Sequence, residues 1–220
     1  LIGIINNGLE DKLDELRKGR SAVLENDHTL ILGWTPQIFT VISELVLANE
    51  SRKSGAVIVI LADHDKVGME DAIHERVPDT KNTRVICRSG SPNDLTDLEI
   101  ASPHTARSII VLAEGADPDT HVIKSVLALT NNPNRRAEPY HIVTQIHDPR
   151  NLDVVKMIGT KDLVQPILAN DLIARVVAQT SRQSGLSLVY TELMKFISSR
   201  SLRFRVKLLA MRCMPMKHPL

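Results

Sequence analysis

Aromatic residues make up only 3% of the 220-residue sequence, so they cannot form its core. Val, Ile and Leu must fill the core instead, a composition typical of a parallel sheet buried on both faces. The chain is long enough for one sizeable domain with appendages. It contains two cysteines, Cys87 and Cys213, which excludes a disulfide framework and fits a reducing compartment.

Long hydrophobic runs are also missing. No stretch of about 18 apolar residues occurs, so we expect no membrane-spanning segment within these residues. Because the sequence opens with leucine, we interpret it as a fragment or a processed product. A spanning segment upstream stays open, and the opening "LIGIINNG" is then either the exit of that segment or an ordinary helix start.

Acidic residues are absent after Glu192, whereas seven basic residues follow it. Without those seven, 20 basic and 26 acidic residues remain, a formal net charge of about −6 for residues 1–192. A mildly acidic body argues against nucleic acid as the partner. The basic residues 197–220 have three interpretations: a membrane-surface tail, an unstructured extension, or aberrant translation of the gene's end.

Apolar runs recur at regular intervals, and most are continuous rather than alternating, as in strands buried on both faces. Helical patterns lie between them, as at 38–46 and 122–129. This alternation predicts an α/β fold with a Rossmann-like, doubly wound parallel sheet of about six strands. The expected strands are 28–34, 56–62, 83–87, 108–113, 141–146 and 162–168. Pro166 cannot donate to a ladder, so we expect the last strand at an edge.

Four helix starts share a pattern in which a capping side chain precedes a proline at the first helical position. They are Thr35-Pro36, Ser91-Pro92, Asp117-Pro118 and Asp148-Pro149. The pattern predicts good helix capping. It also places helix starts at the carboxyl edge of the sheet, where backbone amides favour anions and where open α/β sheets bind ligands.

The chain divides into four segments. Residues 1–27 form an expected amphipathic helix, and residues 28–169 form the Rossmann-like domain. Residues 170–196 form a helical segment that starts at Asn170-Asp171 and is broken near Gly185, and 197–220 is the basic tail.

The glycine-rich phosphate loop of nucleotide-binding folds is missing from its usual place. In a G-x-G-x-x-G fingerprint the later glycines let the pyrophosphate approach the backbone and the helix pack closely. The corresponding residues here are Gly33, Thr35 and Ile38, so only the first glycine is present. We therefore do not expect tight NAD binding in the usual pose.

The remaining residues that predict a ligand crevice lie at strand ends. Trp34 and Thr35 follow Gly33, and Asp63 ends the second strand, where an acid can accept from a ribose hydroxyl. Arg88 and Ser89 follow the third strand and are expected at the crevice mouth, within reach of a ligand phosphate. These candidate ligand-binding residues do not identify the effector, for which a nucleotide and calcium are both candidates.

Catalytic and metal motifs are weak. "CRSG" (87–90) resembles the start of a phosphatase loop, but the arginine that closes such a loop is replaced by Asn93, so a buried strand cysteine is favoured. The histidines lack zinc-site spacing, and the acid pairs Asp63/Asp65 and Asp117/Asp119 could hold calcium only loosely. No catalytic residue is predicted.

Several segments carry a resemblance to a known family. They are "LRKGRSAVLENDHTLILGW", "VIVILADHDKVGMED", "RVICRSGSPNDLTDLEIASPHTARSIIVLA" and "IGTKDLVQPILANDLIARVVAQTSRQSGLSLVYTELMKF". Over residues 9–196 the sequence resembles the cytosolic part of Castor/Pollux-type ion channels of the bacterial kind. This part belongs with the RCK, or TrkA-N-like, domains.

The resemblance implies a non-catalytic gating-ring domain at the cytoplasmic face of a membrane, below a pore that conducts monovalent, potassium-like ions or calcium. Residues 1–27 would link to the channel's own pore domain upstream. Residues 170–196 would be crossover and dimerisation helices of a homo-oligomer, a dimer within a tetrameric channel or gating ring. The tail after 197 departs from the family, where a further regulatory subdomain would begin.

Two alternatives stay open. The strand–Gly33–helix turn and Asp63 also suit an NAD(P)-dependent oxidoreductase or epimerase. A stand-alone soluble regulatory subunit of a potassium transporter would share the same fold.

Overall fold

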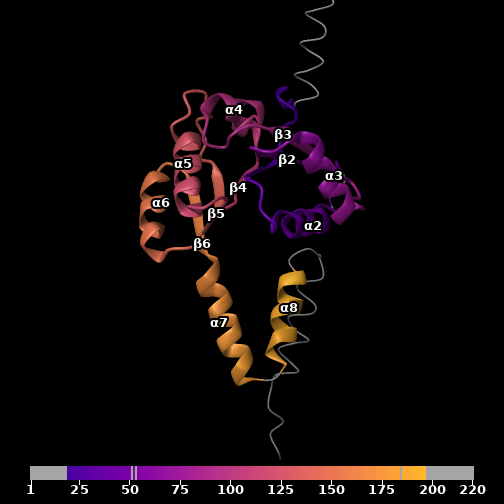
Figure 1. The fold of residues 1–220 in the computed structure, drawn as a ribbon, viewed down its shortest axis with the longest axis vertical. Coiled ribbons are helices and arrows are strands. Elements are labelled where there is room, and N and C mark those ends of the chain that lie inside the picture. Colours follow the sequence, from indigo (N-terminus) through magenta and orange to yellow (C-terminus); the bar gives the residue numbers. More distant parts are fainter. Residues whose placement is uncertain (1–18, 51, 53, 184, 197–220) are drawn as a thin grey trace, which may run out of the picture.

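The computed structural model describes residues 19–50, 52, 54–183 and 185–196. The helix expected from Leu9 to Leu16 and the basic tail both lie outside these residues. The described part forms a three-layered body, from which a pair of helices projects (Figure 1).

The sheet has six parallel strands in the order β3-β2-β1-β4-β5-β6, which confirms the predicted Rossmann-like fold. The strands are β1 (Thr29–Leu32), β2 (Ala56–Ala62), β3 (Thr83–Ser89), β4 (Ser108–Val111), β5 (His141–Ile146) and β6 (Leu163–Leu168). All of β1 and most of β2 are buried, as the unbroken apolar runs predict, whereas β6 has no buried residue. Strand β6 lies at an edge of the sheet and has a neighbouring strand on one side only, so the missing N–H of Pro166 is tolerated there.

Helices cover the two faces of the sheet in separate groups. Helices α2 (Ile38–Asn49) and α3 (Lys66–Arg76) pack on one face through Ile42, Met69 and Ile73. Helices α4 (Leu95–Ile100), α5 (Pro118–Thr130) and α6 (Leu152–Ile158) pack on the other face. Two short 3-10 turns, η1 (Pro103–Thr105) and η2 (Pro149–Asn151), complete the body.

The face that carries α2 and α3 is covered only over half of the sheet. Over β4, β5 and β6 an apolar groove of about 310 Å³ runs past Ile110, Val143 and Ile167 to Ala169. The side chains of Leu163 and Ile167 are 62% and 45% exposed there. The described residues leave this strip without a helical cover.

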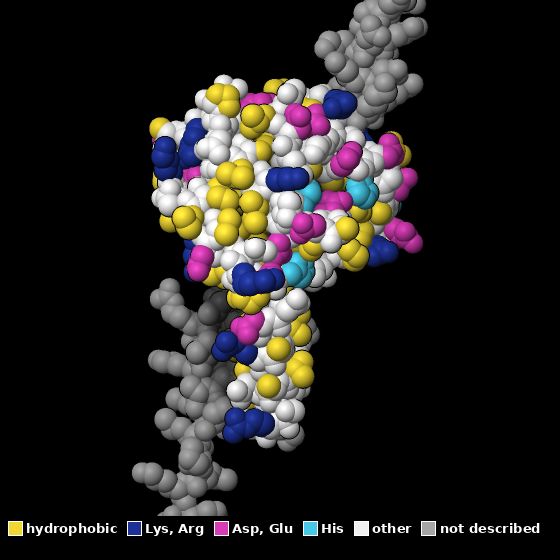
Figure 2. All heavy atoms as spheres, turned by 60° about the vertical axis from the view of Figure 1, so that its left-hand side comes forward, with side chains coloured by type: hydrophobic (Ala, Val, Ile, Leu, Met, Phe, Trp, Pro, Cys, Tyr) yellow, Lys and Arg dark blue, Asp and Glu magenta, His cyan; other side chains and the backbone are white. Residues whose placement is uncertain are grey.

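Helices α7 (Ala169–Arg182) and α8 (Leu186–Phe196) form a hairpin that projects away from the sheet (Figure 1). No residue of α7 is buried, and hydrophobic side chains line the projecting part (Figure 2). The exposed apolar residues are Leu172, Ile173, Val177, Leu188 and Leu193. The described part of the chain thus ends in an amphipathic hairpin on which, within the described residues, these apolar side chains are exposed.

The predicted helix caps are right at two of the four positions. The Asp117 carboxylate accepts from the Thr120 N–H at the start of α5, and Asp148 accepts from the Arg150 N–H at the start of η2. Thr35 and Ser91 do not cap helices, which corrects the sequence-based expectation.

The two wrong caps have a common cause. Helix α2 begins at Ile38 without a side-chain cap, and α4 begins at Leu95 with Asp94 as its cap. Proline has a fixed φ and no N–H, so it suits a turn as well as a first helical position. Pro36 and Pro92 occupy turns that precede the helices. Helix α7, expected to start at Asn170-Asp171, likewise begins at Ala169 without a side-chain cap.

Candidate ligand crevice at the carboxyl edge of the sheet

A cleft of about 360 Å³ lies at the carboxyl ends of β1 and β4. It is lined by Trp34, Thr35, Pro36, Gln37, Ala113, Glu114, Gly115, Gln145 and His147. The strand order reverses between β1 and β4, and open α/β sheets bind their ligands at this switch point. The topology therefore places the cleft where the fold favours a ligand.

Gly33 makes the turn that ends β1 possible. Its φ is +93°, a conformation that side chains other than glycine rarely adopt. Its N–H donates to the Leu61 carbonyl at 2.9 Å. A Cβ at this position would lie 3.1 Å from the Leu112 carbonyl oxygen and 3.2 Å from Oε2 of Glu114. The one glycine kept from the nucleotide fingerprint is thus required by the fold itself.

Glu114 is the charged residue of the cleft that sequence reasoning missed. Its Oε2 accepts the backbone N–H of Trp34 at 2.8 Å, and its Oε1 lies 3.7 Å from Nδ1 of His64. The signal was available, because Glu114 follows directly on the fourth strand at the predicted ligand edge. Its negative charge also acts on His121, where it opposes the burial that lowers the pKa of that imidazole.

Aromatic packing fixes the near wall of the cleft. The indole of Trp34 meets Phe39 edge-on, with 5.6 Å between ring centroids and 83° between the planes. The imidazole of His64 also packs near the indole, with 6.1 Å between ring centroids. Contacts of this kind are favourable and directional, so they hold Trp34 in place beside Glu114.

Asp119 fixes the opposite wall, although it does not line the cleft. Its buried carboxylate accepts from the N–H groups of His147 and Asp148 and from Nδ2 of Asn151, at 2.8, 2.9 and 2.8 Å. Burial alone would raise the pKa of Asp119, but these donors and the nearby His147 outweigh it and lower that pKa. The loop that carries His147 is thereby held in position.

The acid pairs do not gather into a metal-binding cluster within the described residues. Both oxygens of Asp119 are taken up by N–H donors, and Asp117 and Asp65 cap helices. Across the described residues, no group of three or more His, Cys, Asp or Glu side chains is placed to hold a metal ion. Calcium coordination needs six to eight oxygen ligands, which these pairs do not offer.

Arg88 and Ser89 do not line the cleft. Arg88 Nε donates to the Ser21 carbonyl at 2.7 Å, and its Nη1 donates to the Cys87 carbonyl at 2.9 Å. The Ser89 N–H donates to the Gly19 carbonyl at 3.3 Å. These residues hold the segment before β1 against β3. Asp63 is exposed and does not line the cleft either. Of the predicted site residues, Trp34 and Thr35 line the cleft, and Gly33 forms the turn directly before them. A ligand contact by the other three stays a prediction.

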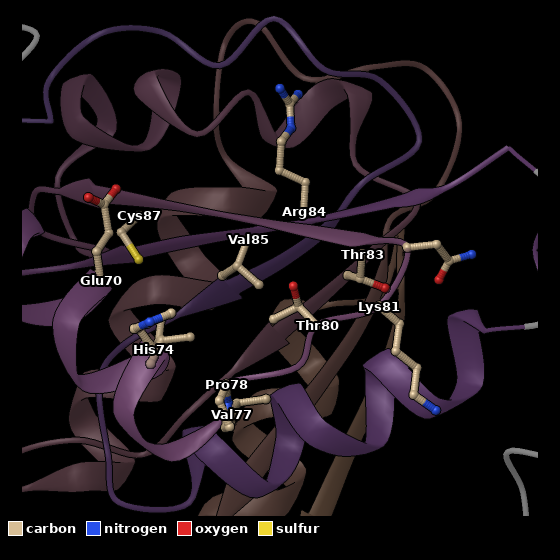
Figure 3. Close-up of a pocket in the computed structure, with 12 residues that line it drawn as sticks. Glu70, His74, Val77, Pro78, Thr80, Lys81, Thr83, Arg84, Val85 and Cys87 are labelled. Atoms are coloured by element: carbon tan, nitrogen blue, oxygen red, sulfur yellow. The ribbon is translucent and has the colours of Figure 1, made fainter.

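A larger cavity, of about 570 Å³, lies beside β3 rather than at the ligand edge of β1 and β4. Figure 3 shows Glu70, His74 and Cys87 at one end of it and Lys81 at the other. Cys87 is buried, and burial raises the pKa of its thiol to about 12. Since the thiolate is the nucleophile of cysteine chemistry, Cys87 is the buried strand cysteine that the sequence favours.

The fold and the cleft at its switch point define a Rossmann-type α/β domain, and solved channel structures share this fold. The gating ring of human SLO3 aligns with a TM-score of 0.60 at 15% identity, over 84% of this chain and 36% of that one. The GsuK channel aligns with a TM-score of 0.51 at 22% identity, over 76% of this chain and 26% of that one. At these identities the likeness concerns the fold alone. No protein-family model matches the chain.

Sequence similarity points to a particular group of channels. The chain is 40% identical over 199 residues to the ion channel CASTOR of Lotus japonicus and 39% identical to a probable CASTOR channel of Oryza sativa subsp. japonica. It is 38% identical to a probable POLLUX channel of Arabidopsis thaliana. The chain is therefore a sequence relative of the Castor and Pollux ion channels, which confirms the resemblance stated from its segments.

The matches cover most of this chain but only a small part of each relative. Each match covers 89% of this chain, but the chain spans only 22–24% of the length of these relatives. No helix within the described residues is long and apolar enough to cross a membrane. The relatives are ion channels rather than enzymes.

Proposed function

We propose that this chain is a regulatory domain of a cation channel, on the cytoplasmic face of the membrane, and that it couples an effector in the β1–β4 cleft to the opening of a pore. The observation that carries the proposal is the 40% identity, over 89% of the chain, to a segment of an ion channel. The cleft supports it, because it lies at the ligand edge of the sheet and has an aromatic wall and one carboxylate.

The cleft has a structural route to the projecting helices. Gln37 and Gln145 line both the cleft and the apolar groove over β4–β6, and that groove ends at Ala169, the first residue of α7. A ligand that shifts the cleft walls would move residues that the groove shares. The hairpin is thus placed to transmit a change in the cleft.

A homo-oligomer is the second part of the proposal. The amphipathic hairpin exposes Ile173 and Val177, at 58% and 62%, and the groove exposes Ile167 at 45%. Soluble domains rarely leave contiguous apolar surface of this kind uncovered unless it meets a partner. We infer that copies of the chain assemble through these surfaces, as subunits of a dimer within a larger gating ring.

The segment before β1 provides the mechanical link to a pore domain upstream. Three of its backbone groups are tied to the body: Gly19 and Ser21 through β3, and Val23 through the Ile100 carbonyl at 2.8 Å. A displacement of the body would therefore pull on the chain that precedes it.

A chimeric channel tests the proposal. Residues 19–196 would replace the matching segment of the Lotus japonicus channel, and currents would be recorded from membranes that contain the chimera. We expect currents comparable to those of the parent channel. The matched control is the same chimera with Leu30→Asp, which places a charge in the fully buried β1 and should abolish the current. A chimera that reaches the membrane and assembles but passes no current would contradict the proposal.

A further inference from the structure

The phosphate position of the Rossmann fold is already occupied within this chain. In dinucleotide sites the turn after the first strand offers backbone N–H groups to the pyrophosphate. Here the Trp34 N–H is bound to Glu114 Oε2 at 2.8 Å. A carboxylate from the end of β4 thus takes the place of the ligand's anion.

Packing leaves no space for a second anion at this donor. Glu114 Oε2 lies 3.2 Å from where a Cβ on Gly33 would be, so the carboxylate rests against the turn itself. Farther along the turn, the Ile38 N–H donates to the Thr35 carbonyl at 3.0 Å. A phosphate oxygen could reach the Trp34 N–H only if Glu114 moved away.

The charges of the cleft oppose phosphate as well. Of its nine lining residues Glu114 is the one acid, and none is lysine or arginine. His147 is the one imidazole among them, and its Nδ1 lies 3.4 Å from the carboxylate of Asp119. A phosphate in the cleft would be repelled by the Glu114 carboxylate, and no lysine or arginine lines the cleft to offset that repulsion.

We infer that Glu114 is a specificity-determining residue, an internal anion that excludes phosphate-bearing ligands from the cleft and leaves it to neutral or cationic groups. The nucleotide that the fold family implies does not fit the residues present. This inference deepens the proposed function, since it rests on the cleft as the effector site and narrows the class of effector.

A binding experiment on the 220-residue chain tests it with ADP, NAD⁺ and inorganic phosphate as probes. The readouts are calorimetric titration and the amide NMR signal of Trp34. For the native chain we expect no saturable binding and no shift of the Trp34 amide at millimolar probe. For Glu114→Ala we expect ADP to bind at least about tenfold more tightly and to shift the Trp34 amide, because the donor is freed and the repulsion removed.

Controls make each outcome decisive. Glu138→Ala removes one negative charge from an exposed loop and should leave binding as in the native chain. Glu114→Gln keeps a group that can accept from Trp34 while it removes the charge, so a smaller but measurable gain is expected. That variant decides the matter if the alanine variant does not fold.

Two results would overturn the inference. One is saturable ADP binding to the native chain with a shift of the Trp34 amide. The other is a folded Glu114 variant that gains no more affinity than Glu138→Ala. Either result concerns binding to the chain alone, whereas a silent chimera would count against the channel role, so the two failures can be told apart.

Discussion

The guanidinium of Arg135 donates two hydrogen bonds, of 2.8 and 3.2 Å, to the carboxylate of Asp162, whose side chain is fully buried. The same carboxylate accepts the Tyr140 N–H at 2.7 Å. This pair ties the polar loop before β5 to the loop before β6. A contact between residues 27 positions apart thereby sets where two strands begin.

Asp162→Ala should lower the free energy of unfolding by about 3 kcal/mol, because it leaves a partly buried guanidinium without its counter-charge and the Tyr140 N–H without an acceptor. Urea unfolding followed by circular dichroism measures the loss. Asp171→Ala is the control, since Asp171 pairs with Arg175 on the exposed surface of α7 and its removal should not be measurable. Equal losses in the two variants would refute the role of the buried pair.

Gly33→Ala and Gly115→Ala form a matched pair of substitutions at positive φ, +93° and +86°. Alanine at Gly115 meets nothing within 4 Å and should cost only the backbone penalty, about 1 kcal/mol. Alanine at Gly33 also meets the Leu112 carbonyl and Glu114, so we expect a loss at least about 1 kcal/mol larger. Thermal and urea unfolding of both variants measure the difference. Identical losses would show that the β1 turn relaxes freely.

The sheet could be predicted from sequence because its signal is local. Buried runs such as 56–62 need only Val, Ile and Leu in succession, and the edge position of β6 follows from Pro166 alone. Helix starts were less certain, since a proline suits both a turn and a first helical position. Thr35-Pro36 lies in the turn before α2, whereas Asp117-Pro118 caps and begins α5.

The candidate site depended on contacts that no local pattern carries. Glu114 and Trp34 are 80 positions apart, and they meet only because β1 pairs with β4. Arg88 was placed correctly at the end of β3, but its side chain turns to the Ser21 carbonyl, a partner that strand position does not reveal. Sequence thus predicted the edge of the sheet where the cleft lies, but only two of the side chains that line it, Trp34 and Thr35.

Asp119→Asn tests the anchor of the His147 loop through its pH dependence. The pKa of Asp119 is lowered from 3.8 in the folded chain, so its stabilising contribution is complete above about pH 4 and is lost as the pH falls through the folded value. At pH 7 we expect the variant to be less stable by about 1–3 kcal/mol, because an amide cannot satisfy the same N–H donors.

The stability difference between the native chain and Asp119→Asn should depend on pH in one direction. Urea unfolding at several pH values should show the gap between native and Asp119→Asn narrowing below pH 4, as the native carboxylate becomes protonated. Asp153→Asn, an exposed acid on α6, should match the native chain at pH 7. A gap that stays constant down to pH 2 would contradict the hydrogen-bonded carboxylate.

Ile173→Asp combined with Val177→Asp tests the proposed oligomer. Both side chains lie on α7, one helical turn apart and more than half exposed, so the double variant should fold like the native chain. Charges buried in an apolar contact are costly. We therefore expect the dissociation constant of the oligomer to rise at least about tenfold in the double variant, as measured by analytical ultracentrifugation. Val67→Asp, at a residue that is 54% exposed on α3, places one such charge on the body and should leave assembly unchanged. If the double variant assembled as well as this control, the apolar side chains of the hairpin would not form the contact between subunits.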